Sequence, residues 1–209
     1  MKQFNDDFKS KLYETIKDIE NNSLVEIVSI IKAKSGNYRE ISLWIAAVAM
    51  FLTSSWLMFS KFEVDVYYIY LITIVSFIIV YLLTEIIKSW KRLFIKKKRM
   101  KRNVEIYGRA IFQKGGIRFT NERIGVLFYV SMFEKQVFIL PDRGAETSVP
   151  DEEWQKMNTD FQSIFSEKDI AGAFIKELIK CKEIFAKYIL PVENDINELP
   201  DDLEVDFKN

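Results

Sequence analysis

The 209-residue sequence contains no histidine and a single cysteine. The absence of histidine excludes Ser-His-Asp and Cys-His catalysis, a histidine general base and histidine ligands for a metal. Cys181 has no second cysteine with which to form an internal disulfide, as suits a reducing compartment. Its neighbours have the spacing of an amphipathic helix, so we interpret Cys181 as a packed side chain rather than a nucleophile. Any chemistry would use carboxylates, hydroxyls, Lys, Arg or a bound hard metal.

The chain also lacks a net charge, because 30 basic residues balance 30 acidic ones. A nucleic-acid-binding domain is usually basic as a whole, so this balance argues against one. The charges are unevenly placed, since basic residues gather at 88–102 and acidic residues gather after 192. The first residues are polar and acidic, and we therefore expect no cleavable signal peptide.

Charged residues are absent from two long apolar runs, Ile41–Ser60 and Val66–Thr84. At 1.5 Å per residue, a helix over either run can cross a hydrocarbon core of about 30 Å. Only residues 61–65 separate the runs, so the chain must turn at the far face and return. The alternative is a buried hairpin in a soluble core, where helices rarely run this long without a charge. We expect a transmembrane helical hairpin.

Basic residues next to the hairpin predict its orientation. The loop at 61–65 has one Lys and two acids, whereas a basic run follows the second apolar segment. Basic flanks stay in the cytoplasm, so we expect a multi-pass protein of the cytoplasmic (inner) membrane with both termini cytoplasmic. The basic run predicts contact with anionic lipid headgroups, and we expect no nucleic acid because Lys and Arg are usual beside a span. The residues concerned are Lys88, Lys91, Arg92, Lys96, Lys97, Lys98 and Arg99.

Helices and strands alternate in the rest of the chain. Asn5 can cap a helix with apolar residues at every third or fourth position up to Asn21, and the β-branched run at 23–33 predicts a buried strand. The helix of the second span should continue, with or without a break in the basic stretch, until Gly115. Further expected elements are strands at 124–131 and 136–140, a turn at 132–135, and helices after Pro150 and from Asp169 to Pro191.

This order predicts a small mixed-sheet α/β sandwich with the two-helix transmembrane hairpin inserted after the first strand. The first two strands should be parallel because a crossover joins them, and the third should be antiparallel beside the second. The predicted segments are 1–40 with the first helix and strand, 41–84 with the hairpin, 85–114 with a basic juxtamembrane helix, 115–191 with the rest of the domain, and 192–209 as an extended or disordered acidic tail.

Three stretches resemble the TPM domain family. They are Arg123–Ser131, a strand that opens with Arg-x-Gly-Val-Leu, then Glu134–Leu140, and then Asp142-Arg143-Gly144. The strand at 23–28 and the segment 197–201 are also similar, and the resemblance covers about 5–35 and 103–201. It implies an α/β sandwich with a small mixed sheet.

The functions that this resemblance implies are diverse. Family members include photosystem repair or assembly factors, a receptor auxiliary protein and weak divalent-metal-dependent phosphatases. Most of them present the domain to the lumen, the periplasm or the outside. The charge pattern places this domain in the cytoplasm instead.

The expected register of the second and third strands brings charged residues to their open end. If the turn centres on Phe133 and Glu134, Arg123 lies roughly opposite Arg143. Carboxylates with two Arg groups could hold a hard cation, Ca²⁺ or Mg²⁺, together with a phosphate. The candidate metal ligands are Asp142, Glu122 and Asp151, and the candidate catalytic residues are Asp142, Arg143 and Arg123.

Two other interpretations stay open. Arg123 and Asp142 could form a structural ion pair that locks the strand ends, with Gly144 supplying a positive φ. Ligands of open α/β sheets also usually bind at the carboxyl ends of parallel strands, which is the opposite end of this sheet. That end carries Lys34, Ser35 and Glu134.

The sequence supports two hypotheses about function. The first is a non-enzymatic assembly, repair or quality-control factor that binds another membrane protein. The second is a metal-dependent phosphomonoesterase, in which Asp142 with Glu122 or Asp151 holds the cation and Arg123 or Arg143 holds the phosphate. We favour the first, because the sequence shows neither a nucleophile with a positioned base nor a glycine-rich phosphate loop.

Overall fold

The computed structural model describes residues 3–61, 64–115, 117, 123–191 and 204–206, the last three without their side chains. The chain forms two compact units. We name Met1–Ser35 with Lys101–Asn209 the α/β unit, and Gly36–Met100 the hairpin unit.

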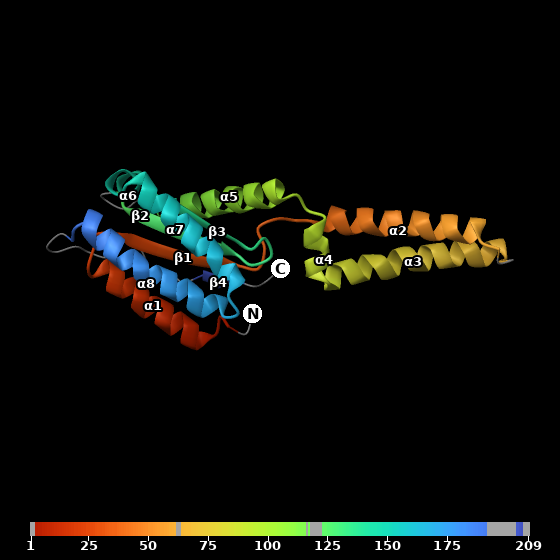
Figure 1. Ribbon diagram of the computed structural model, residues 1–209, viewed down its shortest axis with the longest axis horizontal. Helices are drawn as coiled ribbons and strands as arrows, with labels where there is room; N and C mark the ends of the chain where they lie inside the picture. The colour runs from red at the N-terminus through yellow and green to blue at the C-terminus, as the bar shows by residue number, and fades with distance from the viewer. Residues whose placement is uncertain (1–2, 62–63, 116, 118–122, 192–203, 207–209) are drawn as a thin grey trace. The chain divides into compact units, whose positions relative to one another are not determined.

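A mixed sheet forms the centre of the α/β unit, as predicted (Figure 1). β1 (Glu26–Lys32) runs parallel to β2 (Gly125–Ser131), and β3 (Gln136–Pro141) runs antiparallel to β2. A short β4 (Glu204–Asp206) lies parallel to β1, within the tail for which we predict an extended or disordered chain. The strand order is β3-β2-β1-β4, so β3 is an edge strand.

The helices of the α/β unit begin and end at recognisable caps. The Asn5 side chain accepts a hydrogen bond from the N–H of Phe8 at 3.0 Å and starts α1, and Asp169 does the same for Gly172 at 3.1 Å in α8. The short α6 is absent from the sequence prediction. The helices are α1 (Asp6–Glu20), α5 (Lys97–Lys114), α6 (Arg143–Ser148), α7 (Asp151–Ser163) and α8 (Ile170–Tyr188), with a 3₁₀ turn η2 (Ile164–Ser166).

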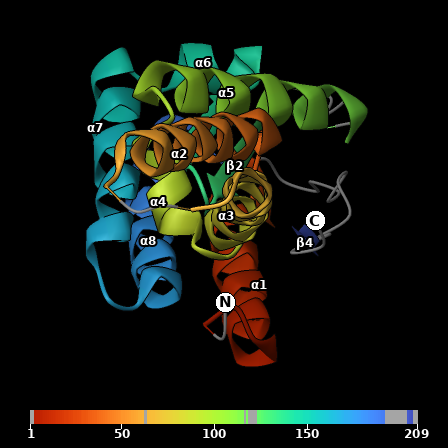
Figure 2. The ribbon, with the colours of Figure 1, turned by 90° about the vertical axis from the view of Figure 1, so that its right-hand side faces the viewer.

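Side chains of β2 alternate between two hydrophobic cores, as the period of a strand requires. Phe128 packs with residues of α1, α7 and α8, including Phe161 at 5.0 Å between ring centroids. Leu127 and Tyr129 pack with Val104 and Phe112 of α5 on the other face. The sheet therefore separates α5 from α1, α7 and α8, and α8 packs beside both α1 and α7 (Figure 2).

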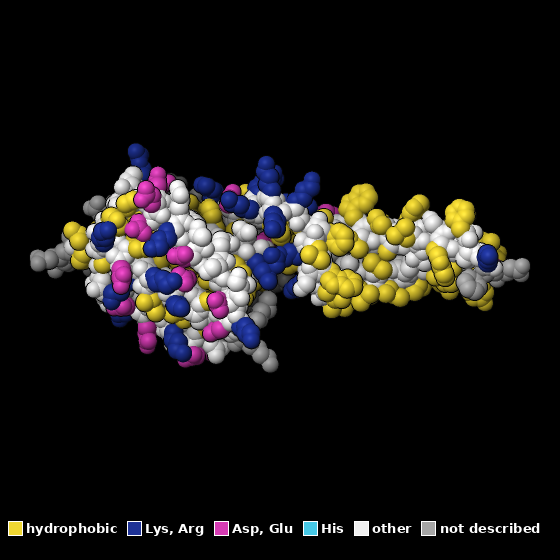
Figure 3. Space-filling view, in the orientation of Figure 1, with side chains coloured by type: hydrophobic (Ala, Val, Ile, Leu, Met, Phe, Trp, Pro, Cys, Tyr) yellow, Lys and Arg dark blue, Asp and Glu magenta, His cyan; other side chains and the backbone are white. Residues whose placement is uncertain are grey.

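Two long helices dominate the hairpin unit and directly follow β1 in the chain. α2 (Arg39–Phe59) and α3 (Val66–Ile86) pack against each other, and both are long and apolar enough to cross a membrane. Their large apolar side chains face outward, as Trp44 at 70% and Tyr67 at 84% exposure illustrate. Hydrophobic side chains cover this surface (Figure 3).

The helix after α3 is broken within the basic stretch. α3 ends at Ile86, the short α4 (Lys88–Leu93) follows, and α5 begins at Lys97. Ile87 at the first break has φ −90° and ψ 75°, outside the helical region, so the helical direction changes before α4.

Candidate functional site

Asp142 has a structural role at the open end of the β2–β3 pair. It precedes α6, and its Oδ1 accepts a hydrogen bond from the Arg143 N–H at 2.8 Å. Its own N–H donates to the Gly125 carbonyl at 2.7 Å and extends the ladder past β3. Its Oδ2 is buried and has no hydrogen-bond partner. One carboxylate oxygen is thus used by the fold and the other remains available.

Arg123 contributes its backbone to this end of the sheet. Its carbonyl accepts hydrogen bonds from the N–H groups of Gly144 at 2.8 Å and Ala145 at 3.3 Å. The positive φ occurs at Arg123, with a value of 54°, while Gly144 lies in the first turn of α6. The side chains of Arg123 and Asp142, which the structure describes, form no ion pair. The hypothesis of a structural lock between these two side chains is therefore wrong.

The other predicted site residues either begin helices or lie outside the described residues. Arg143 begins α6 and is exposed, and Asp151 begins α7, where its charge favours the helix N-terminus. Glu122 lies outside the described residues. Within the described ranges, no group of three or more acidic or cysteine side chains could hold a metal ion.

A buried polar network occupies the opposite end of the parallel strands. The Ser35 hydroxyl lies 2.7 Å from the Tyr129 hydroxyl and donates to the Ser131 hydroxyl at 2.7 Å. Ser131 in turn donates to one carboxylate oxygen of Glu134, and the Ser35 N–H donates to the other at 3.0 Å. Burial raises the pKa of Tyr129, which stays protonated. These groups satisfy one another and close the end of β1 onto the β2–β3 turn.

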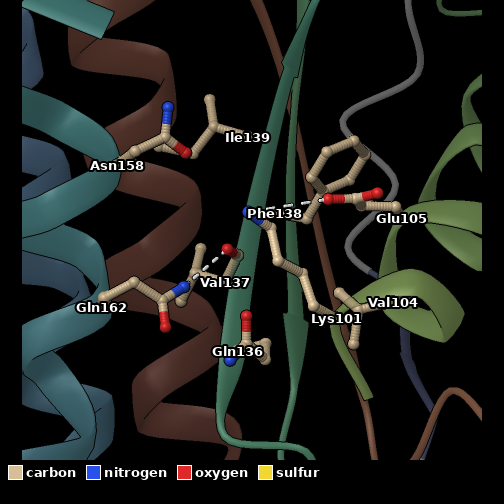
Figure 4. Close-up of a pocket in the computed structure, with 9 residues that line it drawn as sticks. All are labelled: Lys101, Val104, Glu105, Gln136, Val137, Phe138, Ile139, Asn158 and Gln162. Carbon is tan, nitrogen blue, oxygen red and sulfur yellow. Dashed lines mark hydrogen bonds and ion pairs between the residues drawn. The ribbon is translucent and has the colours of Figure 1, made fainter. Parts of the chain in front are cut away.

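A cleft of about 430 Å³ lies along β3, between α5 and α7 (Figure 4). Sequence reasoning missed it, although β3 follows β2 by a hairpin and ends at Pro141, a residue that sheets accept mainly at their edges. The lining residues are Lys101, Val104 and Glu105 of α5, Gln136, Val137, Phe138 and Ile139 of β3, and Asn158 and Gln162 of α7.

Residues 93–181 match the family model of the TPM domain. This part of the chain is similar to TPM domains. The matched residues contain β2, β3, Asp142 and the cleft, but neither α1 nor β1. No curated protein matches the sequence.

The whole chain also shares its fold with a solved structure. It is similar to the NMR structure of the BA42 protein from the psychrophilic bacterium Bizionia argentinensis, with a TM-score of 0.58 and 17% sequence identity. The alignment covers 97% of this chain and 94% of that chain. The α/β fold inferred from the order of helices and strands is thereby confirmed.

Polar contacts hold the base of the hairpin. The buried Ser42 hydroxyl donates to Glu85 at 2.7 Å, and the Lys91 ammonium contacts the same carboxylate oxygen at 2.5 Å. Arg99 pairs with Glu40 and lies over the Tyr38 ring. Two members of the predicted headgroup-binding set, Lys91 and Arg99, are therefore engaged within the protein.

The remaining five basic residues of that set form no ion pair in the part of the chain that the structure describes. Large apolar side chains accompany them, since Trp90, Leu93 and Phe94 are all exposed, Leu93 to 82%. We name Lys88, Arg92, Lys96, Lys97 and Lys98 the basic collar.

Proposed function

We propose that this protein is anchored in the cytoplasmic membrane by α2 and α3 and acts as a non-enzymatic assembly, repair or quality-control factor for another membrane protein. The observation that carries the proposal is the outward-facing apolar surface of the hairpin unit. Soluble monomers rarely expose a contiguous apolar patch larger than a few hundred Å², and a bilayer would cover this one.

Polar groups within the two helices agree with a membrane environment. In hydrocarbon each polar group needs an internal partner. The hydroxyl of Thr73 donates to the Ile69 carbonyl at 2.7 Å, and that of Thr84 to the Tyr81 carbonyl at 2.8 Å, both within α3. The charged side chain of Glu85 lies at the helix end, where Ser42 and Lys91 bind it.

The basic collar supports an orientation with both termini in the cytoplasm. Lys and Arg near a span are retained on that side, and each contributes about 1 kcal/mol of attraction to an anionic surface. The exposed Trp90, Leu93 and Phe94 would enter the interface beside them. Anionic headgroups are the lipid partner that this combination favours.

Cysteine labelling tests the anchor and its orientation. In intact cells that express Cys181→Ser, an introduced Lys61→Cys in the connecting loop should react with a membrane-impermeant maleimide. Lys9→Cys in α1 should react only after permeabilisation. The opposite pattern would reverse the orientation, and release of the protein by alkaline carbonate would refute the membrane anchor.

The role in assembly needs a separate test. In cells that lack the protein, at least one membrane complex should lose abundance or assembly, and the full-length chain should restore it. A membrane proteome that is unchanged under growth and stress would contradict the proposal.

One observation favours a second candidate function, a weak metal-dependent phosphatase. The buried, unpartnered Oδ2 of Asp142 suits a Ca²⁺ or Mg²⁺ ion, which prefers carboxylate oxygens. Glu122 or Asp151 would supply a second carboxylate, and Arg123 or Arg143 would bind the phosphate. Asp142→Asn keeps an acceptor oxygen at the start of α6, so the domain should stay folded. The same change removes the carboxylate charge, so it should abolish any metal-dependent hydrolysis of p-nitrophenyl phosphate.

A further inference from the structure

We infer that the cleft along β3 binds an extended, uncharged peptide segment, which adds to the sheet as a strand beside β3. This inference rests on the proposed function, since it gives the chemistry of the polypeptide that the TPM domain would bind. It is carried by the open backbone edge of β3, the lining of the cleft and its two helical walls.

The backbone N–H and C=O groups of β3 point alternately towards β2 and towards the cleft. The N–H of Asp142 points to Gly125 on β2, and successive residues of a strand point to alternate sides. The N–H and C=O groups of Val137 and Ile139 therefore point away from β2, into the cleft. The register of β2 and β3, with Val130 opposite Val137, agrees with this assignment.

One of these outward groups already binds a peptide-like donor. The carboxamide of Gln162 donates to the Val137 carbonyl at 2.7 Å (Figure 4). Among the described residues, no partner is recorded for the Val137 N–H, the Ile139 N–H or the Ile139 carbonyl. An incoming strand would pair with these three groups and replace Gln162 at the fourth.

The lining favours a neutral peptide over a charged ligand. The charged side chains of the lining, Lys101 and Glu105, lie four residues apart with their charged atoms 3.9 Å from each other. The other polar side chains are the carboxamides of Gln136, Asn158 and Gln162. A carboxamide both donates and accepts, as a peptide group does, whereas an anion would need uncompensated basic groups.

The walls of the cleft favour a single extended segment over a second copy of this chain. Residues of α5 line one side of β3 and residues of α7 line the other, so the edge is recessed between two helices. The β3 edge of a second copy would carry the same two helices, and these would collide before the strands could pair. A peptide without its own flanking helices enters freely.

A peptide selected from a displayed library of random octamers against the full-length protein in nanodiscs is the probe. N-methylation of single residues removes one peptide N–H at a time. Methylation at alternate positions, those that face β3, should weaken binding at least tenfold, and methylation at the intervening positions should change it less than threefold. Failure to select any binder, or equal effects at all positions, would overturn the inference.

Two variants of α7 provide a matched test on the protein. Asn158 is exposed and lines the cleft, so Asn158→Trp should fill it and weaken peptide binding at least tenfold. Gln155 is exposed on the same helix and does not line the cleft, so Gln155→Trp should leave the affinity unchanged. Equal unfolding temperatures would show that both variants fold. Unchanged affinity in Asn158→Trp would refute the site.

Photo-crosslinking in cells separates failure of this inference from failure of the proposed function. A benzophenone side chain replaces Asn158 in one strain and the exposed Lys180 of α8 in another. The inference predicts crosslinks to a membrane protein at Asn158 that excess selected peptide suppresses. Crosslinks at Lys180 alone would refute peptide binding in the cleft but would still support a domain that binds a partner protein. Crosslinks between two copies at Asn158 would overturn the inference by showing that the cleft is used for self-association. No crosslinks at either position, together with an unchanged membrane proteome, would refute the proposed function itself.

Discussion

Replacement of Ser131 by Ala should destabilise the α/β unit much more than replacement of Ser29 by Ala. Both hydroxyls are buried on adjacent strands, with residue exposures of 0% and 2%. Ser131 accepts from Ser35 and donates to the buried Glu134, whereas the Ser29 hydroxyl has no partner. The two variants remove the same atom from buried positions and differ in the hydrogen bonds lost.

The magnitudes follow from those bonds. Ser131→Ala removes two buried hydrogen bonds, one of them to a carboxylate, and each loss costs about 1 to 2 kcal/mol, so the opening free energy should fall by about 2 to 4 kcal/mol. Ser29→Ala removes a buried hydroxyl that lacks a partner, so it should be neutral or stabilising by up to about 1 kcal/mol.

Hydrogen exchange measured by mass spectrometry on the full-length protein in nanodiscs can resolve this difference. Peptides from β2 report the opening of the α/β unit without requiring the hairpin to unfold. Amides of β2 should exchange about 30- to 700-fold faster in Ser131→Ala, by the conversion of 1.4 kcal/mol per factor of ten. Equal protection in the two variants would refute the network as a source of stability.

Three further predictions concern single positions. Burial raises the pKa of the Cys181 thiol from 9.0 to about 12. The stability that the protonated thiol contributes is therefore complete below pH 9.0 and is lost as the pH rises towards 12. In Cys181→Ala, the free energy of unfolding should fall less steeply with pH over this alkaline range. Asp142→Ala should lower stability by about 1 kcal/mol through loss of the α6 cap, while Asp142→Asn should retain it; urea unfolding of both tests this. A Cβ at Gly125 would lie 2.6 Å from the Ile117 carbonyl oxygen, so Gly125→Ala should cost about 1 to 3 kcal/mol, and an unchanged unfolding temperature would contradict the close approach.

Local patterns were sufficient to predict most helices and strands. The four-residue spacing of Phe8, Leu12 and Ile16 indicated α1, and all three are buried. The β-branched run of β1 and the hairpin length of β2–β3 predicted the mixed sheet, because these signals lie within short segments. Apolar length likewise predicted α2 and α3.

The site features depend on contacts that local patterns do not contain. Ser35 meets Tyr129 across 94 positions of sequence, and nothing near either residue indicates the other. The cleft exists because α5 and α7 pack on opposite faces beyond the last strand, which is a property of the assembled layers. The left-handed conformation occurs at Arg123, before β2, whereas Gly144, for which we predicted it, lies in the first turn of α6.

The pairing of Glu26 with Gly125 has a consequence for the order in which this protein is made. α1 and β1 leave the ribosome first, but their neighbour β2 follows roughly 100 residues later, which at 5–20 residues per second is a delay of about 5 to 20 s. Both apolar helices emerge during that interval. The first segment therefore waits without a sheet partner while the hairpin is synthesised, and a chain that stops before residue 125 leaves β1 with neither β2 nor β4 beside it. The sheet of the α/β unit can therefore form only after the hairpin has been synthesised.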